Sequence, residues 1–77
     1  MSNHNPHSNP PIGEQIKLRR KELGVTQPDV AELAGISLNT LYKIETGQSS
    51  PTIKVLERIL DVLGMELNVQ IKSSKRF

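Results

Sequence analysis

The fold is decided by residues 26–47, which read TQPDVAELAGISLNTLYKIETG. Thr26 can cap the first turn of a helix, and Asp29, three residues later, would complete a capping box. Pro28 fits only near such a start, because a helix interior would need the N–H that proline lacks. Gly35 supplies a left-handed stop. Helical spacing then predicts one apolar face made of Val30, Leu33 and Ala34.

A second short helix follows almost at once. Ser37 is its predicted N-cap and Gly47 its end, while Leu41 and Ile44 form its apolar stripe. Two helices joined by such a short turn cross steeply, which is the helix-turn-helix geometry. The second helix is predicted to present an outward face typical of a helix that reads DNA, composed of Leu38, Asn39, Tyr42 and Lys43.

This pattern resembles the Xre/Cro-like helix-turn-helix repressors related to the phage lambda and 434 repressors. The resemblance covers residues 12–64 and rests on the joint spacing of Arg20, Thr26-Gln27, Leu33-Ala34, Gly35, Ser37, Leu41, Ile44, Glu45 and Gly47. Pro28 departs from the family, which usually carries an acidic or other helix-forming residue there. The resemblance implies an all-α, lambda-repressor-like domain of four helices.

The composition sets the scale of the protein. Its 77 residues allow one small domain, and they include no cysteine, so disulfides and thiol metal sites are excluded. A small core without such links often relies on oligomerisation, so a dimer is expected. The formal net charge of +2 permits nucleic-acid binding without demanding it. Neither a membrane-spanning apolar run nor a signal-peptide pattern is evident, which predicts a cytoplasmic protein. No cofactor is expected.

The polar N-terminal stretch, residues 1–11, is predicted to be a disordered tail. It contains His4 and His7. Loss of Met1 would leave a Ser-Asn-His terminus able to hold copper or nickel, but two solvated histidines without a metal are the preferred interpretation.

The first helix is predicted to run from Ile12 to Leu23, with Gly24 as its stop. Ile12, Ile16 and Leu23 follow helical spacing, and Lys17, Arg19, Arg20 and Lys21 give the helix a basic face. In the family, the Arg seven residues before the Gln that opens the next helix pairs with the Glu at the end of the recognition helix. The resemblance therefore implies a structural ion pair between Arg20 and Glu45.

The fourth helix, Ile53 to Leu63, follows an N-cap at Thr52 and is unusually apolar. Its polar residues form one narrow stripe. Two apolar faces lie beside each other, the first made of Ile53, Leu56, Leu60 and Leu63 and the second of Val55, Ile59 and Val62. A doubled face predicts burial on two sides, against the chain's own core and against another segment.

Residues 65–72 alternate strictly between apolar and polar side chains, which predicts a strand. A lone strand has no partner for its backbone groups, so pairing with the same strand of a second subunit is expected. The predicted dimerisation residues are Val55, Ile59, Val62, Met65, Leu67, Val69 and Ile71. A basic tail, 73–77, ends the chain. This ending resembles the HipB-type antitoxins, which dimerise through an intersubunit ribbon and bind the kinase toxin HipA.

The resemblance also assigns DNA-binding roles. The residues predicted to contact bases are Ser37, Leu38, Asn39 and Lys43. Those predicted to contact phosphates are Gln27, Thr40, Tyr42, Thr46, Gln48 and Ser50. Tyr42 could equally be a packing ring, and Lys17 and Arg19 could reach flanking phosphates.

These features predict a repressor that binds a palindromic operator as a homodimer, and that serves as the antitoxin of a HipA/HipB-like module with a HipA-like kinase toxin as partner. Two alternatives stay open: an Xre-family regulator without a toxin, and a protein-interaction module that keeps the fold without binding DNA. An enzyme is not expected, because the sequence offers no cysteine, no histidine outside the N-terminal stretch, no carboxylate pair and no Gly-rich phosphate loop.

Overall fold

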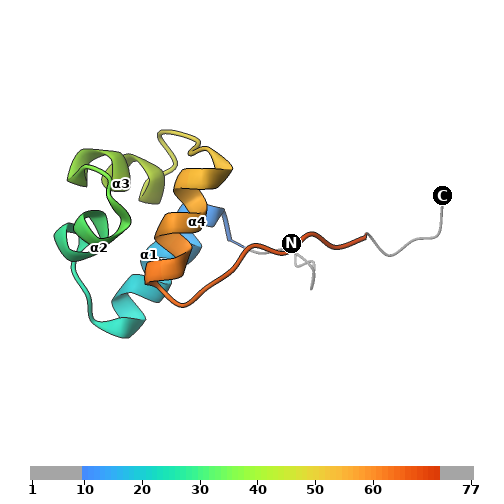
Figure 1. The fold of residues 1–77 in the computed structure, drawn as a ribbon, viewed down its shortest axis with the longest axis horizontal. Helices are drawn as coiled ribbons and strands as arrows, with labels where there is room; N and C mark the ends of the chain where they lie inside the picture. The colour runs from blue at the N-terminus through green and yellow to red at the C-terminus, as the bar shows by residue number, and fades with distance from the viewer. Residues whose placement is uncertain (1–9, 72–77) are drawn as a thin grey trace, which may run out of the picture.

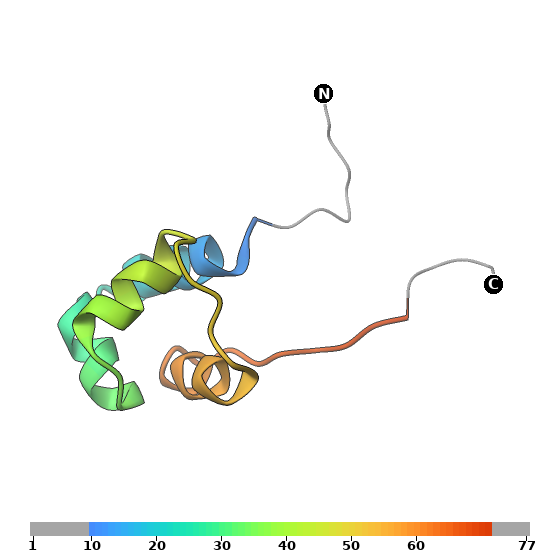
Figure 2. The ribbon, with the colours of Figure 1, turned by 90° about the horizontal axis from the view of Figure 1, so that it is seen from above.

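The computed structural model describes residues 10–71 and contains four α-helices. They are α1 (Ile12–Leu23), α2 (Gln27–Ala34), α3 (Leu38–Glu45) and α4 (Ile53–Val62). Figures 1 and 2 show these helices gathered into one body, from which the segment after α4 runs away. The predicted all-α class with four helices is confirmed. His4 and His7, Lys72 and the basic tail 73–77 lie outside the described residues.

The helix starts are set by local hydrogen bonds that the sequence predicts. The side chains of Thr26, Ser37 and Thr52 each accept a hydrogen bond from the backbone N–H three residues later, at α2, α3 and α4 respectively. Between α2 and α3, Gly35 has a φ of 73°, a conformation that an L-residue adopts only with strain. The N–H of the next residue, Ile36, donates to the carbonyl of Ala31 at 3.0 Å and closes the turn.

The core is built from one face of each helix. Its buried apolar residues are Ile16, Val30, Ala31, Ala34, Leu41, Ile44, Leu56, Ile59, Leu60 and Leu63. On α1, Ile12 and Leu23 are 39% and 45% exposed, so the only fully buried residue of the predicted stripe of that helix is Ile16.

The predicted face of α2 is wrong in one residue. Leu33 is 73% exposed, and Ala31 is buried in its place. At 3.6 residues per turn, Val30, Ala31 and Ala34 share an arc of about 100°, and Leu33 lies about 60° beyond its edge. The apolar pattern alone fits both arcs, and the packing of α2 against α3 and α4 selects the second one.

The two predicted faces of α4 are also corrected. Leu56, Ile59, Leu60 and Leu63 are buried together, which corresponds to a single stripe about 100° wide. Ile59 is 0% exposed, so its assignment to a second, partner-facing stripe is wrong. Val55 and Val62 are half-buried at the edge of the same core, and Ile53 is 68% exposed.

The segment after α4 is anchored only at its beginning. The N–H of Met65 donates to the carbonyl of Leu60 at 2.8 Å, and the Met65 side chain packs against the core. Residues 66–71 are exposed and form no strand, with Val69 and Ile71 at 101% and 97% exposure. A strand needs a neighbour for its hydrogen-bond ladder, and the described part of this single chain supplies none.

Three links between helices were not predicted from the sequence. The backbones of α1 and α3 approach closely at Gly13, where a Cβ atom would overlap the carbonyl oxygen of Ile44. Arg58 on α4 donates from Nε to the carbonyl of Ala34 at the end of α2, at 2.9 Å. Arg19 on α1 donates from Nε to the carbonyl of Leu63 at 2.9 Å, so it ties α1 to the end of α4.

Candidate nucleic-acid interface

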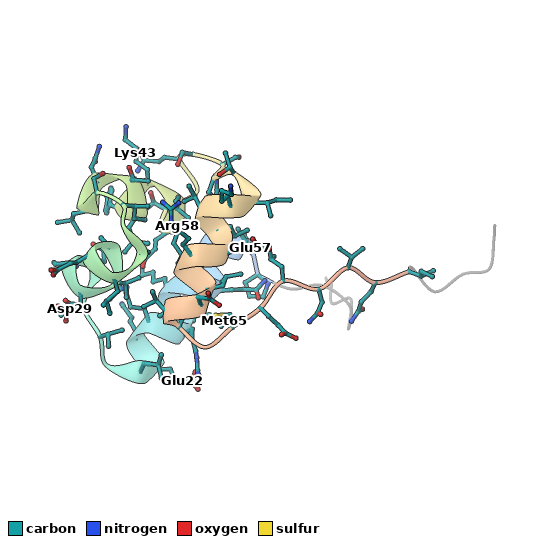
Figure 3. All side chains as sticks on the ribbon, viewed as in Figure 1. Glu22, Asp29, Lys43, Glu57, Arg58 and Met65 are labelled. Atoms are coloured by element: carbon teal, nitrogen blue, oxygen red, sulfur yellow. The ribbon has the colours of Figure 1, made fainter. Side chains whose placement is uncertain are left out.

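The third helix has a buried side and an exposed side. Leu41, Ile44 and Glu45 face the core, and the predicted outward residues Leu38, Asn39, Tyr42 and Lys43 are all exposed. Figure 3 shows Lys43 projecting away from the body, at the opposite edge of the view from Glu22. Within residues 10–71, the side chains of Asn39 and Lys43 make no hydrogen bond, and the carbonyl of Lys43 accepts one from Thr46 Oγ1 at 3.4 Å. Their polar groups are therefore available to another molecule.

A buried ion pair holds the inner side of α3. The Glu45 carboxylate accepts from Arg20 Nε at 2.7 Å and from Arg20 Nη2 at 3.0 Å, a two-pronged arrangement. The two side chains are only 10% and 1% exposed. The hydrogen bond that Arg20 donates to Glu45 raises the pKa of Arg20 above its ordinary value, and the negative charge of Glu45 adds to the effect, while burial opposes it. The structure thus brings together the pair that the family resemblance implies.

Gln27 extends this pair into a three-residue network. Its Nε2 donates to Glu45 Oε1 at 2.9 Å, and the residue is half-buried. Arg20 also donates from Nη1 to the carbonyl of Val25 at 3.0 Å, in the connection before α2. The network therefore fixes the beginning of α2 and the end of α3 to α1. Gln27, predicted from the sequence as a phosphate ligand, has its side-chain amide committed to Glu45 in this arrangement.

The first turn of α3 is held by Ser37 and Thr40. Ser37 Oγ accepts from the N–H of Thr40 at 3.0 Å and donates to Thr40 Oγ1 at 2.8 Å. Both residues are exposed. They combine a structural role as a cap with a position at the exposed N-terminal end of the helix.

A polar chain continues past the end of α3. Thr46 Oγ1 donates to the carbonyl of Tyr42 at 2.9 Å, and Gln48 Nε2 donates to Thr46 Oγ1 at 2.8 Å. These residues and Ser50 are exposed. We call the exposed residues of α3 and of its two flanking connections the α3 face. It consists of Ser37, Leu38, Asn39, Thr40, Tyr42, Lys43, Thr46, Gln48 and Ser50.

No group of three or more His, Asp or Glu side chains within residues 10–71 is arranged to hold a metal ion. Over the same residues, every helix is too short or too polar to cross a bilayer.

The comparisons with known proteins agree with this geometry. An uncharacterized HTH-type transcriptional regulator of Methanothermobacter thermautotrophicus is 41% identical over 51 residues, covering 66% of this chain and 74% of the relative. The ImmF control region 10 kDa protein of Bacillus phage phi105 is 38% identical over 58 residues, and the match covers 75% of this chain and 64% of the phage protein. The chain therefore spans less than two thirds of that second relative.

A solved structure shares both sequence and fold with the chain. It is the crystal structure of SinR, the master regulator for biofilm formation, in complex with DNA, at 39% identity and a TM-score of 0.66, and the match covers 71% of this chain and 89% of the SinR chain in that structure. The names of these proteins agree with the sequence-based prediction that the chain is not an enzyme. The helix-turn-helix family HTH_3 matches residues 16–70, and the chain belongs to this family of Xre and lambda-repressor type.

Proposed function

We propose that the protein is a transcriptional regulator that inserts α3 into the major groove of DNA. The observation that carries this proposal is the two-sided build of α3: Arg20 and Glu45 fix its buried side, and Asn39 and Lys43 stand exposed and unbonded on the other. A helix held this firmly can present polar groups to base edges with little loss of side-chain and backbone entropy on binding. The DNA-bound SinR structure supports the proposal by similarity.

The proposed contacts divide into two groups. Ser37, Leu38, Asn39 and Lys43 contact bases: the amide of Asn39 suits adenine, Lys43 suits guanine, and Leu38 suits a thymine methyl. Phosphate contacts come from Gln27, Thr40, Tyr42, Thr46, Gln48 and Ser50, and the helix dipole at the start of α2 favours an anion beside Gln27. Because Gln27 Nε2 is bonded to Glu45, its contact with a phosphate uses the backbone N–H or a rearranged side chain.

We further propose that the protein binds a palindromic operator as a homodimer. The support is the segment 65–71, whose apolar residues Leu67, Val69 and Ile71 are exposed although their alternation is that of a strand. Pairing of two copies about a two-fold axis would cover these residues and place two α3 helices about 34 Å apart, one turn of DNA. Val55 and Val62 lie at the edge of the core and keep a partial exposure for the same contact.

The test is selection of duplexes from a random pool, followed by mobility-shift titration. Asn39→Ala should weaken binding to the selected duplex by about 1–3 kcal/mol, or roughly 5- to 150-fold, with little change for random DNA. Lys43→Ala should weaken binding, whereas Lys21→Ala, an exposed lysine in the last turn of α1, removes the same charge and serves as the matched control. Failure of the wild-type chain to select any sequence would overturn the proposal.

An antitoxin role is the finer part of this proposal. It is supported by the resemblance of the C-terminal pattern to the HipB-type antitoxins, which bind a kinase toxin. The test is the neighbouring open reading frame: a kinase-like product that co-purifies with this chain supports the role. Selection of an operator without such a partner would leave a regulator without a toxin.

A further inference from the structure

Two adjoining grooves lie on the side of the body where α4 ends. The first has a volume of about 400 Å³ and runs between Ile12, at the beginning of α1, and the segment after α4. The second has a volume of about 330 Å³ and follows α4 itself. Both are lined by Leu60, Met65, Glu66 and Leu67, so they form one surface, which we call the Met65 groove.

The floor of the Met65 groove is apolar and only partly covered. Leu60 is buried and Met65 is half-buried, while Ile12 and Leu67 each keep an exposure of 39%. Single exposed apolar side chains are ordinary on a protein surface, but apolar side chains that gather in a concave place are typical of a binding surface. A side chain seated in the groove would remove this remaining apolar surface from water, which favours binding.

The rim of the groove is acidic. Glu57, Asp61 and Glu66 line its second part, all three are exposed, and none of them forms an ion pair within residues 10–71. Among the described residues, neither part of the groove is lined by a lysine or an arginine. Glu57 and Asp61 lie one helical turn apart on α4, so their carboxylates repel each other. A cation placed between them would relieve this repulsion.

The Met65 groove lies apart from the α3 face and differs from it in charge. Figure 3 shows Glu57 and Met65 beside α4, near the start of the segment that leaves the body, whereas Lys43 lies at the upper edge of the view. Lys43 is the charged residue of the α3 face, and its charge is positive. The carboxylates of the groove repel the phosphates of a nucleic acid. A molecule in the groove therefore leaves the α3 face free for DNA.

Charge and shape together select one kind of occupant. The apolar floor suits leucine-type side chains, and the acidic rim suits lysine or arginine, whose aliphatic stems cover apolar surface while their charged ends reach the carboxylates. An amphipathic segment of a protein carries both kinds of side chain on neighbouring positions. Nucleic acids, anionic lipids and acidic peptides are disfavoured by the same charges.

We propose that the Met65 groove docks a basic amphipathic segment of another protein. The apolar side chains of this segment lie against Leu60, Met65 and Leu67, and its cationic side chains lie against Glu57 and Asp61. The inference is independent of the proposed DNA binding and of the proposed homodimer.

Chemical-shift mapping by NMR on the isotope-labelled full chain tests the location. The probe is an amphipathic peptide of about 18 residues with leucine on one face and lysine on the other, and the control peptide carries glutamate in place of every lysine. The largest shifts should fall on Gln15, Asp61 and Leu67. In anisotropy titrations the glutamate peptide should bind at least tenfold more weakly. Shifts centred on α3, or equal affinity for the two peptides, would overturn the proposal.

Charge reversal tests the rim. Asp61→Lys should weaken binding of the lysine peptide about three- to tenfold, because it replaces an attraction at the rim with a repulsion. Glu32→Lys is the matched control, since Glu32 is an exposed acid at the corresponding end of α2 and lines neither part of the groove. It should change the affinity less than twofold. Equal weakening by both variants would mean that the peptide senses only the overall charge, against the proposal.

A leucine substitution tests the floor. Leu67→Ser should weaken binding about three- to tenfold, because the leucine surface no longer leaves the water when the peptide binds. Leu23→Ser is the control: Leu23, at the end of α1, is 45% exposed and lies outside the groove. If Leu67→Ser bound the peptide like the wild type, charge alone would hold the peptide and the proposed docking would be wrong.

Sedimentation separates another protein from a second copy as the occupant. Asp61→Lys should leave the self-association of the chain unchanged, because the proposed partner is a different protein. If the wild type formed a dimer and Asp61→Lys abolished it, the groove would hold a second copy, and the proposed partner would be wrong.

Discussion

The helical body and the segment 65–71 differ in how far their apolar side chains are buried. In the body, apolar side chains meet across helices, and its buried charges, Arg20 and Glu45, neutralise each other. In the segment, apolar side chains alternate along an exposed backbone and, from Val69 onward, meet nothing within the described residues. The body therefore buries its apolar side chains within one chain and leaves the α3 face exposed, whereas the apolar side chains at the end of the segment stay exposed in the single chain. Substitutions in the two regions should affect different measurements.

The largest effect on the body is expected from Arg20→Met. The substitution leaves the Glu45 carboxylate buried without its charge partner, which should lower the free energy of unfolding by about 3–5 kcal/mol. Chemical denaturation followed by circular dichroism measures this loss. A domain of this size has little stability to spare, so the variant is best characterised at low temperature or in a stabilising co-solvent.

The double variant Arg20→Met/Glu45→Leu shows whether the loss comes from the orphaned charge. It removes both charges and should recover much of the stability, because a buried ion pair can be replaced by apolar side chains at little cost. A double variant as unstable as Arg20→Met would contradict this explanation. Because the pKa of Arg20 is raised, its stabilising contribution is fully present below the ordinary arginine pKa and is lost only as pH rises through the raised value. Arg20 therefore stays charged near neutral pH. Its ionisation should add no pH dependence there to the loss in the free energy of unfolding caused by Arg20→Met.

Gly13→Ala is expected to cause a smaller loss in the free energy of unfolding, although a change from glycine to alanine in a helix usually raises it. In an open helix this change would stabilise by up to about 1 kcal/mol, because alanine is the better helix former. At Gly13 the new Cβ would overlap the Ile44 carbonyl oxygen and lie 3.1 Å from Ile44 C and 3.2 Å from Glu45 C, all backbone atoms. Separating α1 from α3 should cost about 1–3 kcal/mol. Lys17→Ala, at an exposed position of the same helix, is the control, and a stabilised Gly13→Ala variant would show that the two backbones are not in contact.

The same contrast explains what could be predicted from the sequence. Helix limits followed from local groups such as Thr26, Ser37 and Gly35, whose hydrogen bonds span only a few residues. The Arg20–Glu45 pair, 25 residues apart, followed only from the family resemblance. Gly13, Arg19 and Arg58 were missed, because their roles depend on how closely separate helices approach.

Two errors share one physical origin. The predicted placements of Leu33 and Ile59 are wrong because an apolar helix pattern fits more than one arc, and the arc is chosen by the neighbouring helix. The exposed residues of the α3 face were predicted well, since a short helix between two caps leaves only one side for the core. Their contacts with DNA stay a prediction.

The smallest effect on the body, and the sharpest separation of the two regions, is expected from Ile71→Ser. Ile71 is 97% exposed, so at low protein concentration the free energy of unfolding should change by no more than about 0.5 kcal/mol. A dimer that dissociates on unfolding has a Tm that rises with protein concentration, and Ile71→Ser should flatten this rise by weakening the dimer. Leu33→Ser removes a leucine that is 73% exposed on the body and should leave the concentration dependence unchanged. Equal flattening by both variants would mean that exposed apolar surface in general, and not the segment 65–71, drives association.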